Sequence, residues 1–407
     1  MIYDVAVVGG GASGIMAALA ASKGGRRVVL IEQNDRLGKK IVASGNGRCN
    51  YSNTTIESEG NFYMYNNPKF VSYALSNIDS AILRNYFESI GLLSAYEDDR
   101  VYPSSFSSSQ VIDVLRQALE KSGVNVKTGI EILGLSKNKN IFTLTSEERS
   151  FHANAVIVAT GSSAGISKPP KYFLSEHTLT DMVPSMLPIH TDTTYLKGLQ
   201  GVRANVKMTL VYEGDEIHKE EGEILFKDFG VSGMVTFCTS VYLSRILKKG
   251  KFQNAKLYID FLPQYTITKV NEMLMRMANI YSDSNLGGLL VGIFHKNISA
   301  NILAFAGLSA DMEANYNNIH MLSLAIKRFE LQVTGLPNFK NAQIVSGGYN
   351  VAEFSKHSFE SKRIHGLFVV GEALDIDGIC GGFNLHWAFA SGLIAGRKIG
   401  EYLDNDR

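Results

Sequence analysis

The sequence has 407 residues, of which 45% are hydrophobic and 19% are charged. This length exceeds what one hydrophobic core normally supports, so two or three domains are expected. The formal net charge is +1, which gives no electrostatic footprint for nucleic acid or an acidic membrane, and neither is expected as a partner.

The N-terminal stretch carries the pattern of a dinucleotide-binding βαβ unit. YDVAVVG (3–9) is valine-rich and typical of a strand buried on both faces, and RRVVLIE (26–32) is a second such run. Between them, GGGASG places Gly9, Gly11 and Gly14 in a GxGxxG spacing at the start of a helix rich in small residues. Because strand, glycines, helix and second strand are in register, ligand binding is favoured over a glycine-rich turn without a ligand.

Each part of this unit has a physical task. Gly9 permits a tight turn, Gly11 lets the backbone approach a pyrophosphate, and Gly14 allows close packing of helix on strand. The helix N-terminus offers free N–H groups and the positive end of its dipole. Glu32 ends the second strand and can accept hydrogen bonds from a ribose diol. The predicted cofactor contacts here are Gly9, Gly11, Ala12, Ser13, Gly14 and Glu32.

Two later segments favour FAD over NAD as the bound dinucleotide. NAVIVATGSSAG (154–165) is a strand followed by Thr160-Gly161, and GLFVVGEALDIDG (366–378) is another that ends in Gly371-Glu372. Both resemble segments of the two-dinucleotide-binding-domain flavoproteins, in which they return the chain to FAD and place a carboxylate near its ribityl and pyrophosphate. The chain has one full fingerprint after a strand, so one non-covalently bound FAD is expected, with contacts from Thr160, Gly161, Gly371 and Glu372.

The signature LGKKIVASGNGRCNYSN (37–53) strengthens the resemblance. Together with DDRVYPSS (98–105), GEILFKDFGVSG (222–233) and GEALDIDGICGGFNLHWAFASGLIAG (371–396), it resembles a bacterial family of aminoacetone-oxidase-like FAD-binding enzymes, also called NAD(P)/FAD-dependent oxidoreductases. One segment departs from the family: residues 162–189 replace a TGSTGDG-like run, so substrate identity does not carry over through them.

The resemblance implies an α/β fold, with a doubly wound Rossmann-like FAD domain interrupted by a β-rich domain and a small helical domain. The sequence pattern agrees, because 205–226 alternates as strands do, whereas 268–279 and 318–333 have helical periodicity. The expected boundaries are 1–190 and 336–407 for the FAD domain, 191–262 for the β-rich domain and 263–335 for the helical domain.

SGNGRCN is expected to form a loop beside the flavin. Ser44, Gly45, Asn46 and Asn50 are predicted to contact the cofactor, and the alternative is a turn that asparagine side chains stabilise. Arg48 is the candidate cation near the isoalloxazine or a substrate carbonyl, although it could equally brace the loop. Arg48 and Tyr102 are expected to line the substrate pocket.

The C-terminal segment CGGFNLHWAFASG supplies a second group of candidates. Backbone N–H groups at this helix start can stabilise negative charge on a reduced flavin, so Gly382, Phe383 and Asn384 are predicted cofactor contacts. His386 is a candidate proton donor, and the alternative is a histidine whose hydrogen bonds are satisfied within the fold.

The cysteines and acidic residues give weaker signals. Cys49, Cys238 and Cys380 form no close-spaced pair, which argues against disulfides, zinc fingers and CxxC redox chemistry, and packing thiols are favoured. Asp375 and Asp377 have no His or Cys at ligand spacing, so no metal site is expected. The first strand begins at residue 2 and no apolar run reaches the ~18 residues of a membrane helix, so the cytoplasm is the expected compartment.

The predicted function is that of an FAD-dependent oxidoreductase, with a hydride passing to or from flavin N5. The resemblance implies a small organic substrate, either an amine or a conjugated ketone, and leaves open whether NAD(P)H is a transient electron donor. The alternative is a flavin-binding protein that acts on RNA or in a complex with weak turnover of its own. The sequence does not indicate the oligomeric state.

Overall fold

The computed structural model describes residues 1–56, 63, 68–164, 174–247, 251–280 and 285–405. The chain divides into two compact units, Met1–Met182 with Ile344–Arg407, and Val183–Gln343. Each unit surrounds its own cluster of buried hydrophobic side chains, as a chain of this length requires. Part of the segment that departs from the family, 165–173, lies outside the described residues.

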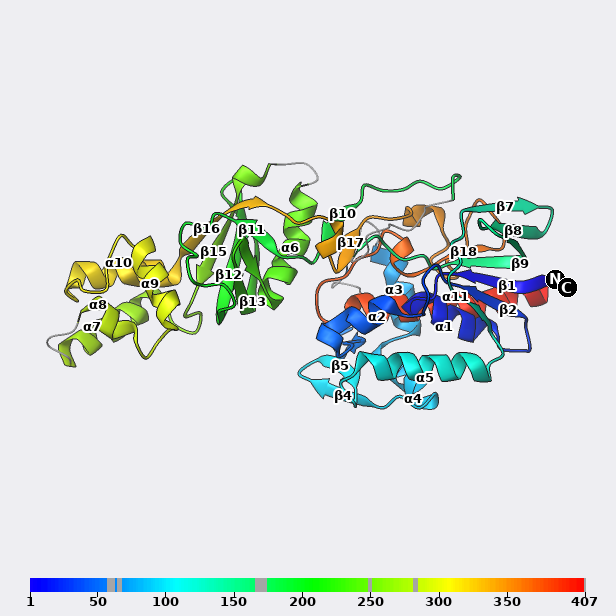
Figure 1. Cartoon of the computed structure of the whole chain (residues 1–407), viewed down its shortest axis with the longest axis horizontal. Coiled ribbons are helices and arrows are strands. Elements are labelled where there is room, and N and C mark those ends of the chain that lie inside the picture. Colours follow the sequence, from blue (N-terminus) through cyan, green and yellow to red (C-terminus); the bar gives the residue numbers. More distant parts are fainter. Residues whose placement is uncertain (57–62, 64–67, 165–173, 248–250, 281–284, 406–407) are drawn as a thin grey trace. The chain divides into compact units, whose positions relative to one another are not determined.

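The first unit is organised by a Rossmann-type sheet (Figure 1). Its parallel strands follow the order β6 (Asn125–Lys127), β2 (Val28–Ile31), β1 (Ile2–Val8), β9 (Ser150–Val158) and β18 (Leu367–Val369). The antiparallel hairpin β7 (Gly134–Asn138) and β8 (Ile141–Thr145) joins the sheet through the first half of β9. Because Val8 pairs with Ile31 and Val158, and Val158 pairs with Val369, four carboxyl ends meet at one edge.

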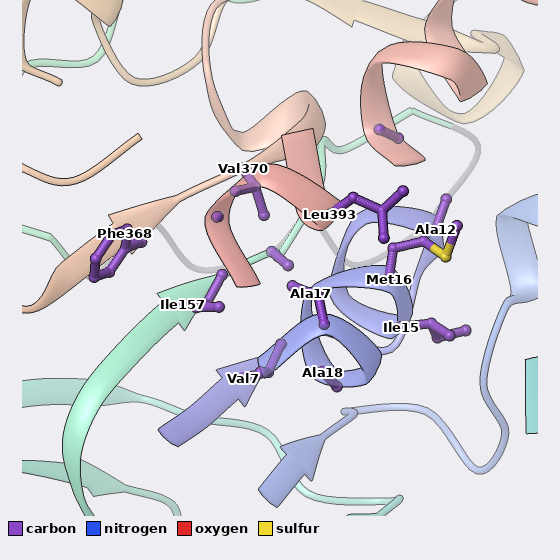
Figure 2. Packing of buried hydrophobic residues seen from close by; sticks show 14 of the residues in the cluster. Val7, Ala12, Ile15, Met16, Ala17, Ala18, Ile157, Phe368, Val370 and Leu393 are labelled. Carbon is purple, nitrogen blue, oxygen red and sulfur yellow. The ribbon is translucent and has the colours of Figure 1, made fainter. Parts of the chain in front are cut away.

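Two helices, α1 (Ala12–Ala21) and α11 (Phe383–Asn405), pack closely against each other beside this sheet. Figure 2 shows Leu393 of α11 directed towards Met16 and Ala12 of α1. Glycines permit the approach, because a Cβ at Gly392 would lie 2.2 Å from the carbonyl oxygen of Ser13. The small residues of the N-terminal helix therefore serve packing against a distant segment of the chain, since Ser13 and Gly392 are 379 positions apart.

The remaining elements of the first unit include a small antiparallel sheet in the order β3-β5-β4. Its strands are β3 (Ser52–Asn53), β5 (Arg100–Pro103) and β4 (Ser94–Glu97). The other helices and strand are α2 (Lys39–Ala43), α3 (Pro68–Asn77), α4 (Ser80–Ser89), α5 (Ser108–Lys121) and β17 (Ile344–Ser346), with 3₁₀ turns at η1 (Ser44–Gly47), η4 (Val351–Glu353) and η5 (Gly371–Ala373).

The second unit contains a closed antiparallel barrel. Its strand order is β11 (Ile189–Thr191), β14 (Gly230–Ser232), β13 (Asp215–Lys227), β12 (Arg203–Tyr212), β15 (Ala255–Asp260) and β16 (Phe329–Gly335). Burial alternates along β15, where Ala255, Leu257 and Ile259 point inward, as expected for a strand with one solvent-facing side. Also in this unit are β10 (Val183–Ser185), α6 (Met234–Leu247), η2 (Phe252–Asn254) and η3 (Phe339–Asn341).

Among the described residues between β15 and β16, the helices are α7 (Ile267–Ile280), α8 (Leu286–Leu290), α9 (Lys296–Phe305) and α10 (Tyr316–Lys327). The helix predicted over 318–333 was wrong at its C-terminal end, because α10 stops at Lys327 and a strand follows. Phe329 pairs with Ile259, and this cross-strand burial outweighs the helical spacing. Barrel and helices share one hydrophobic cluster, and the boundaries within 191–335 stay predictions.

Candidate functional site

The glycine-rich loop connects β1 to α1 at the carboxyl edge of the sheet. Gly9 has φ +109°, and a Cβ there would lie 2.2 Å from the carbonyl oxygen of Ala159. A Cβ at Gly14 would lie 1.8 Å from the carbonyl oxygen of Gly9, so both glycines are required by packing. Gly11 differs, since a Cβ there would meet nothing within 4 Å. The space at Gly11 is therefore available to a ligand, as the fingerprint predicts.

Glu32 lies at the end of β2 with 7% of its surface exposed. Its Oε2 accepts a 2.6 Å hydrogen bond from the backbone N–H of Gly10, and its Oε1 accepts one of 2.8 Å from that of Asn34. The carboxylate thus fixes the glycine-rich loop before any ligand arrives. Gly10 was not among the predicted contacts, and its place inside the GGG run was the signal that could have found it. Ribose binding by Glu32 stays a prediction.

An ion pair that the sequence did not reveal connects α2 to the turn after β18. Nζ of Lys40 lies 2.5 Å from Oε2 of Glu372 and 3.2 Å from Oγ of Ser162. Ser162 also donates to the same Glu372 oxygen over 2.9 Å. The three residues come from α2, the end of β9 and the turn after β18, so the ion pair joins segments 332 positions apart.

Two side-chain oxygens on the predicted cofactor segments have hydrogen-bonding capacity that the protein does not use. Oγ1 of Thr160 and Oδ1 of Asn50 are buried and have no hydrogen-bond partner within the described part of the chain. A Cβ at Gly382 would lie 2.7 Å from that Asn50 oxygen, so only glycine fits there. Gly161 has φ +69° with open space around it. Unused buried acceptors, one of them on the residue before the open Gly161, fit a polar cofactor.

The signature loop makes a local turn at η1. Oγ of Ser44 donates to the carbonyl of Ile41 over 2.6 Å, and Gly45 and Asn46 both have left-handed backbone angles near φ +55°. Gly45 is exposed, and a Cβ there would lie 2.9 Å from the backbone nitrogen of Asn50. The turn therefore holds Asn50 close while leaving Gly45 and Asn46 open to solvent. Contact of these residues with the cofactor stays a prediction.

Arg48 lies over two neighbouring aromatic rings, whose centroids are 5.5 Å apart. Its guanidinium carbon lies 4.6 Å from the ring centroid of Tyr102 and 4.6 Å from that of Phe106. It also forms an ion pair with Glu97, which raises the pKa of the guanidinium. Arg48 keeps 37% of its side chain exposed, whereas only 6% of Tyr102 is exposed. The structure thus brings together Arg48 and Tyr102, which were predicted to line one pocket. Of the two side chains, Arg48 is the more accessible.

His386 is fully buried on α11. Its Nδ1 lies 2.9 Å from Oγ of Ser52, and its Nε2 lies 2.8 Å from the carbonyl oxygen of Ile78, to which it donates as neutral imidazole. Burial lowers the pKa of His386 to about 4. His386 has no exposed surface, and both of its ring nitrogens already have hydrogen-bond partners. This geometry supports the alternative of a satisfied histidine that ties α11 to β3 and the end of α3.

The helix start before His386 is shaped by Asn384. Its Oδ1 accepts from the backbone N–H of Gly378 over 2.7 Å, and its Nδ2 donates to the carbonyl of the same residue over 2.9 Å. Oη of Tyr63 donates to the carbonyl of Phe383 over 2.9 Å. Asn384 therefore uses its amide to close the GICGG loop, and the direct contacts predicted for Gly382, Phe383 and Asn384 stay predictions.

Gly371 forms the turn that presents Glu372. Its N–H donates to Oγ of Ser391, and its carbonyl accepts from Nε1 of Trp387, both over 3.1 Å. A Cβ at Gly371 would lie 2.5 Å from Oγ of Ser13, so the turn lies directly against the start of α1. Ala12 and Ser13 are themselves 9% and 5% exposed. Little of either residue is therefore accessible, and the contacts predicted for Ala12 and Ser13 stay predictions.

The thiol of Cys49 is completely buried, and burial raises its pKa to about 12. A thiol with this pKa is unreactive at neutral pH. Over the part of the chain that the structure describes, no group of three or more His, Cys, Asp or Glu residues could hold a metal ion. Within the same residues, no helix has the length and apolar character needed to cross a bilayer.

Comparison with known proteins decides the family. The model of the HI0933-like protein Rossmann domain matches residues 3–398. This chain belongs to that family. The HI0933-like chain is 30% identical to the 3-dehydro-bile acid delta(4,6)-reductase of Clostridium scindens over 408 residues, covering 98% of this chain and 99% of the relative. It is 26% identical to the ribosomal RNA dihydrouridine synthase of Escherichia coli, covering 96% of each chain.

A solved structure agrees on the fold. The 3-ketosteroid delta1-dehydrogenase of Sterolibacterium denitrificans covers 98% of this HI0933-like chain and 100% of its own, with 12% identity and a TM-score of 0.50. The predicted FAD-binding Rossmann family, the α/β fold and the assignment to FAD-dependent oxidoreductases are confirmed. The substrate, the electron donor and the individual site residues stay predictions.

Proposed function

We propose that this chain is an FAD-dependent reductase that adds hydrogen across a carbon–carbon double bond conjugated to a carbonyl. The observation that carries the proposal is the 30% identity, along 98% of the chain, to a relative named as a 3-dehydro-bile acid delta(4,6)-reductase. The second relative is named as a dihydrouridine synthase. A dienone and a uracil ring both hold a double bond conjugated to a carbonyl, so the two names share one bond type.

The residues present fit FAD, and each has a task in holding it. The open space at Gly11 and the start of α1 would receive the pyrophosphate, and Glu32 would accept from the ribose. Thr160 and Asn50 would supply the acceptors that the protein leaves unused. When bound, FAD supplies hydride transfer, which no amino-acid side chain provides.

Arg48 is the proposed electrophilic group. When a hydride adds to a conjugated ketone, negative charge develops on the carbonyl oxygen, and a fixed cation stabilises it. Arg48 is permanently charged, and Glu97, Tyr102 and Phe106 restrict its movement. A preorganised guanidinium needs little rearrangement as the charge appears. This supports Arg48 as the residue that orients the substrate carbonyl.

The test uses the purified holoenzyme without oxygen. NADH or NADPH is added first to reduce the bound flavin, and a bile acid with a 3-keto-4,6-diene is added second. The proposal expects flavin reoxidation together with loss of the diene absorbance. Turnover of a small amine with no effect of the dienone would overturn it.

A second candidate is reduction of uracil in RNA, because the Escherichia coli relative covers 96% of this chain. The formal net charge of +1 offers no broad phosphate-binding surface, which favours the small ketone. The same anaerobic experiment separates the candidates when ribosomal RNA lacking dihydrouridine replaces the bile acid. Reoxidation by RNA, with dihydrouridine as product, would select the second candidate.

A further inference from the structure

We infer that Lys40 is a positioning residue for FAD, which neutralises Glu372 so that a carboxylate can stand beside the cofactor's pyrophosphate. The inference rests on the proposed FAD site and adds a residue that neither the fingerprint nor the comparisons assign. The proposed role of Lys40 requires no direct contact with a phosphate. Its partner is the carboxylate, and its effect on the cofactor passes through that carboxylate.

The contacts show how Glu372 is held. Lys40 and Ser162 both donate to Oε2 of Glu372, over 2.5 and 2.9 Å. Ser162 is 1% exposed, and the Lys40 and Glu372 side chains are 37% and 16% exposed. Among the described residues, Oε1 of Glu372 has no protein hydrogen-bond partner. One oxygen is therefore fixed by the protein and the other remains available to a hydroxyl group of the cofactor.

Lys40 and Glu372 also belong to segments that contact the glycine-rich loop, where the pyrophosphate is expected. The backbone N–H of Gly38 donates to the carbonyl of Gly10 over 2.9 Å, which places α2 against the glycine-rich loop. From the other side, Gly371 lies against Ser13, since a Cβ there would approach the Ser13 hydroxyl to 2.5 Å. Lys40 and Glu372 therefore extend from the two segments that flank this loop.

Charge explains why the pair is needed. A pyrophosphate is anionic, so an unpaired carboxylate beside it would be repelled, and partial burial reduces screening by salt. Pairing with Lys40 makes the Lys40–Glu372–Ser162 group neutral while it keeps an acceptor oxygen in place. If Glu372 were replaced by glutamine, the repulsion would be absent and Lys40 would no longer be required.

A double-mutant cycle on FAD affinity tests this. Apo-protein of wild type, K40M, E372Q and K40M/E372Q is titrated with FAD at low and high salt. We expect K40M to weaken binding about 30-fold beside the native Glu372 but less than about 3-fold in the E372Q background, because contacting residues are not additive. K40R should stay within about 3-fold of wild type, and high salt should shrink the K40M effect, because charge is the cause.

Lys39 provides the matched control. It lies in the same short helix and pairs with the exposed Asp35, so K39M should leave FAD affinity unchanged. Equal K40M penalties in both backgrounds would overturn the inference and indicate a direct phosphate contact. No K40M penalty in either background would overturn it as well. If wild-type apo-protein bound no FAD, the proposed function itself would fail. Tight FAD binding with the same K40M effect in both backgrounds would reject only the role of Lys40.

Discussion

The carboxylate of Glu32 accepts a 2.6 Å hydrogen bond from the backbone N–H of Gly10, 22 residues earlier in the chain. The residue predicted to bind the ribose and the loop predicted to bind the pyrophosphate are therefore one connected element. A loop that is already fixed loses little conformational freedom when a ligand binds, and such preorganisation favours affinity.

Replacing Glu32 should affect both stability and cofactor binding. E32A leaves the buried N–H of Gly10 without its acceptor, which costs about 1–3 kcal/mol of unfolding free energy. FAD affinity should fall roughly 10- to 100-fold through the lost ribose contact. Urea unfolding and FAD titration of apo-protein measure the two effects. D35A is the control, because this neighbouring acid is 80% exposed. Unchanged affinity in folded E32A would reduce Glu32 to a structural role.

Gly11 tests the position of the pyrophosphate. A Cβ at this glycine would meet nothing within 4 Å, so we expect G11V to fold normally yet fill the space that the cofactor needs. We expect purified G11V to contain less than about a tenth of the wild-type flavin, because a tenfold weaker affinity would by itself leave a nearly saturated site partly filled. G292V is matched, because a Cβ at Gly292 also meets nothing within 4 Å. Full flavin content in G11V would contradict the assignment.

Arg48 should govern turnover and not cofactor content. R48K keeps the positive charge but loses the flat guanidinium that lies over the rings of Tyr102 and Phe106. We expect kcat/KM for the conjugated ketone to fall by about 100-fold or more, by analogy with the loss of one stabilising donor. Steady-state kinetics and flavin absorbance of the same preparation separate the two properties. The exposed Arg116 gives the control R116K. Normal kcat/KM in R48K would remove Arg48 from the site.

His386 should make stability depend on pH. Its folded-state pKa of about 4 lies below the ordinary value of 6.5, so the unfolded chain binds a proton first as the pH falls. The contribution is complete above pH 6.5 and is lost towards pH 4, by roughly 2 kcal/mol at pH 5. Urea unfolding at pH 7.5 and 5 should show a loss of stability that is larger by this amount in wild type than in H386Q, which keeps the contribution of His177. The exposed His365 gives the control H365Q. An equal slope in H386Q would refute the assignment.

Local patterns made much of the fold predictable. The strand ending at Val8, the glycine spacing and the strand ending at Ile31 follow from residues close in sequence, and the parallel register then aligns their ends. Alternation along the barrel strands is equally local. The end of α10 was not predictable from spacing alone, because pairing of Phe329 with Ile259 decided it.

The site was less predictable where its contacts are distant. Lys40 and Glu372 are 332 residues apart, and neither has a local pattern that names the other. His386 looked like a candidate proton donor because composition does not report burial, whereas the structure gives both ring nitrogens partners. Arg48 and Tyr102 were placed together through the family resemblance, but the second ring, Phe106, and the anion, Glu97, needed the folded sheet.

An anaerobic half-reaction followed by absorbance tests most directly whether this chain is an FAD-dependent reductase of conjugated ketones. Purified protein is first denatured in one aliquot to identify and count its released cofactor, and the remainder is reduced with NADPH or NADH and mixed with a conjugated dienone. We expect about one FAD per chain, bleached by the nicotinamide and restored by the dienone as one of its two carbon–carbon double bonds is reduced to give an enone. Release of FMN or NAD in place of FAD, or a reduced flavin that the dienone does not reoxidise, would contradict it.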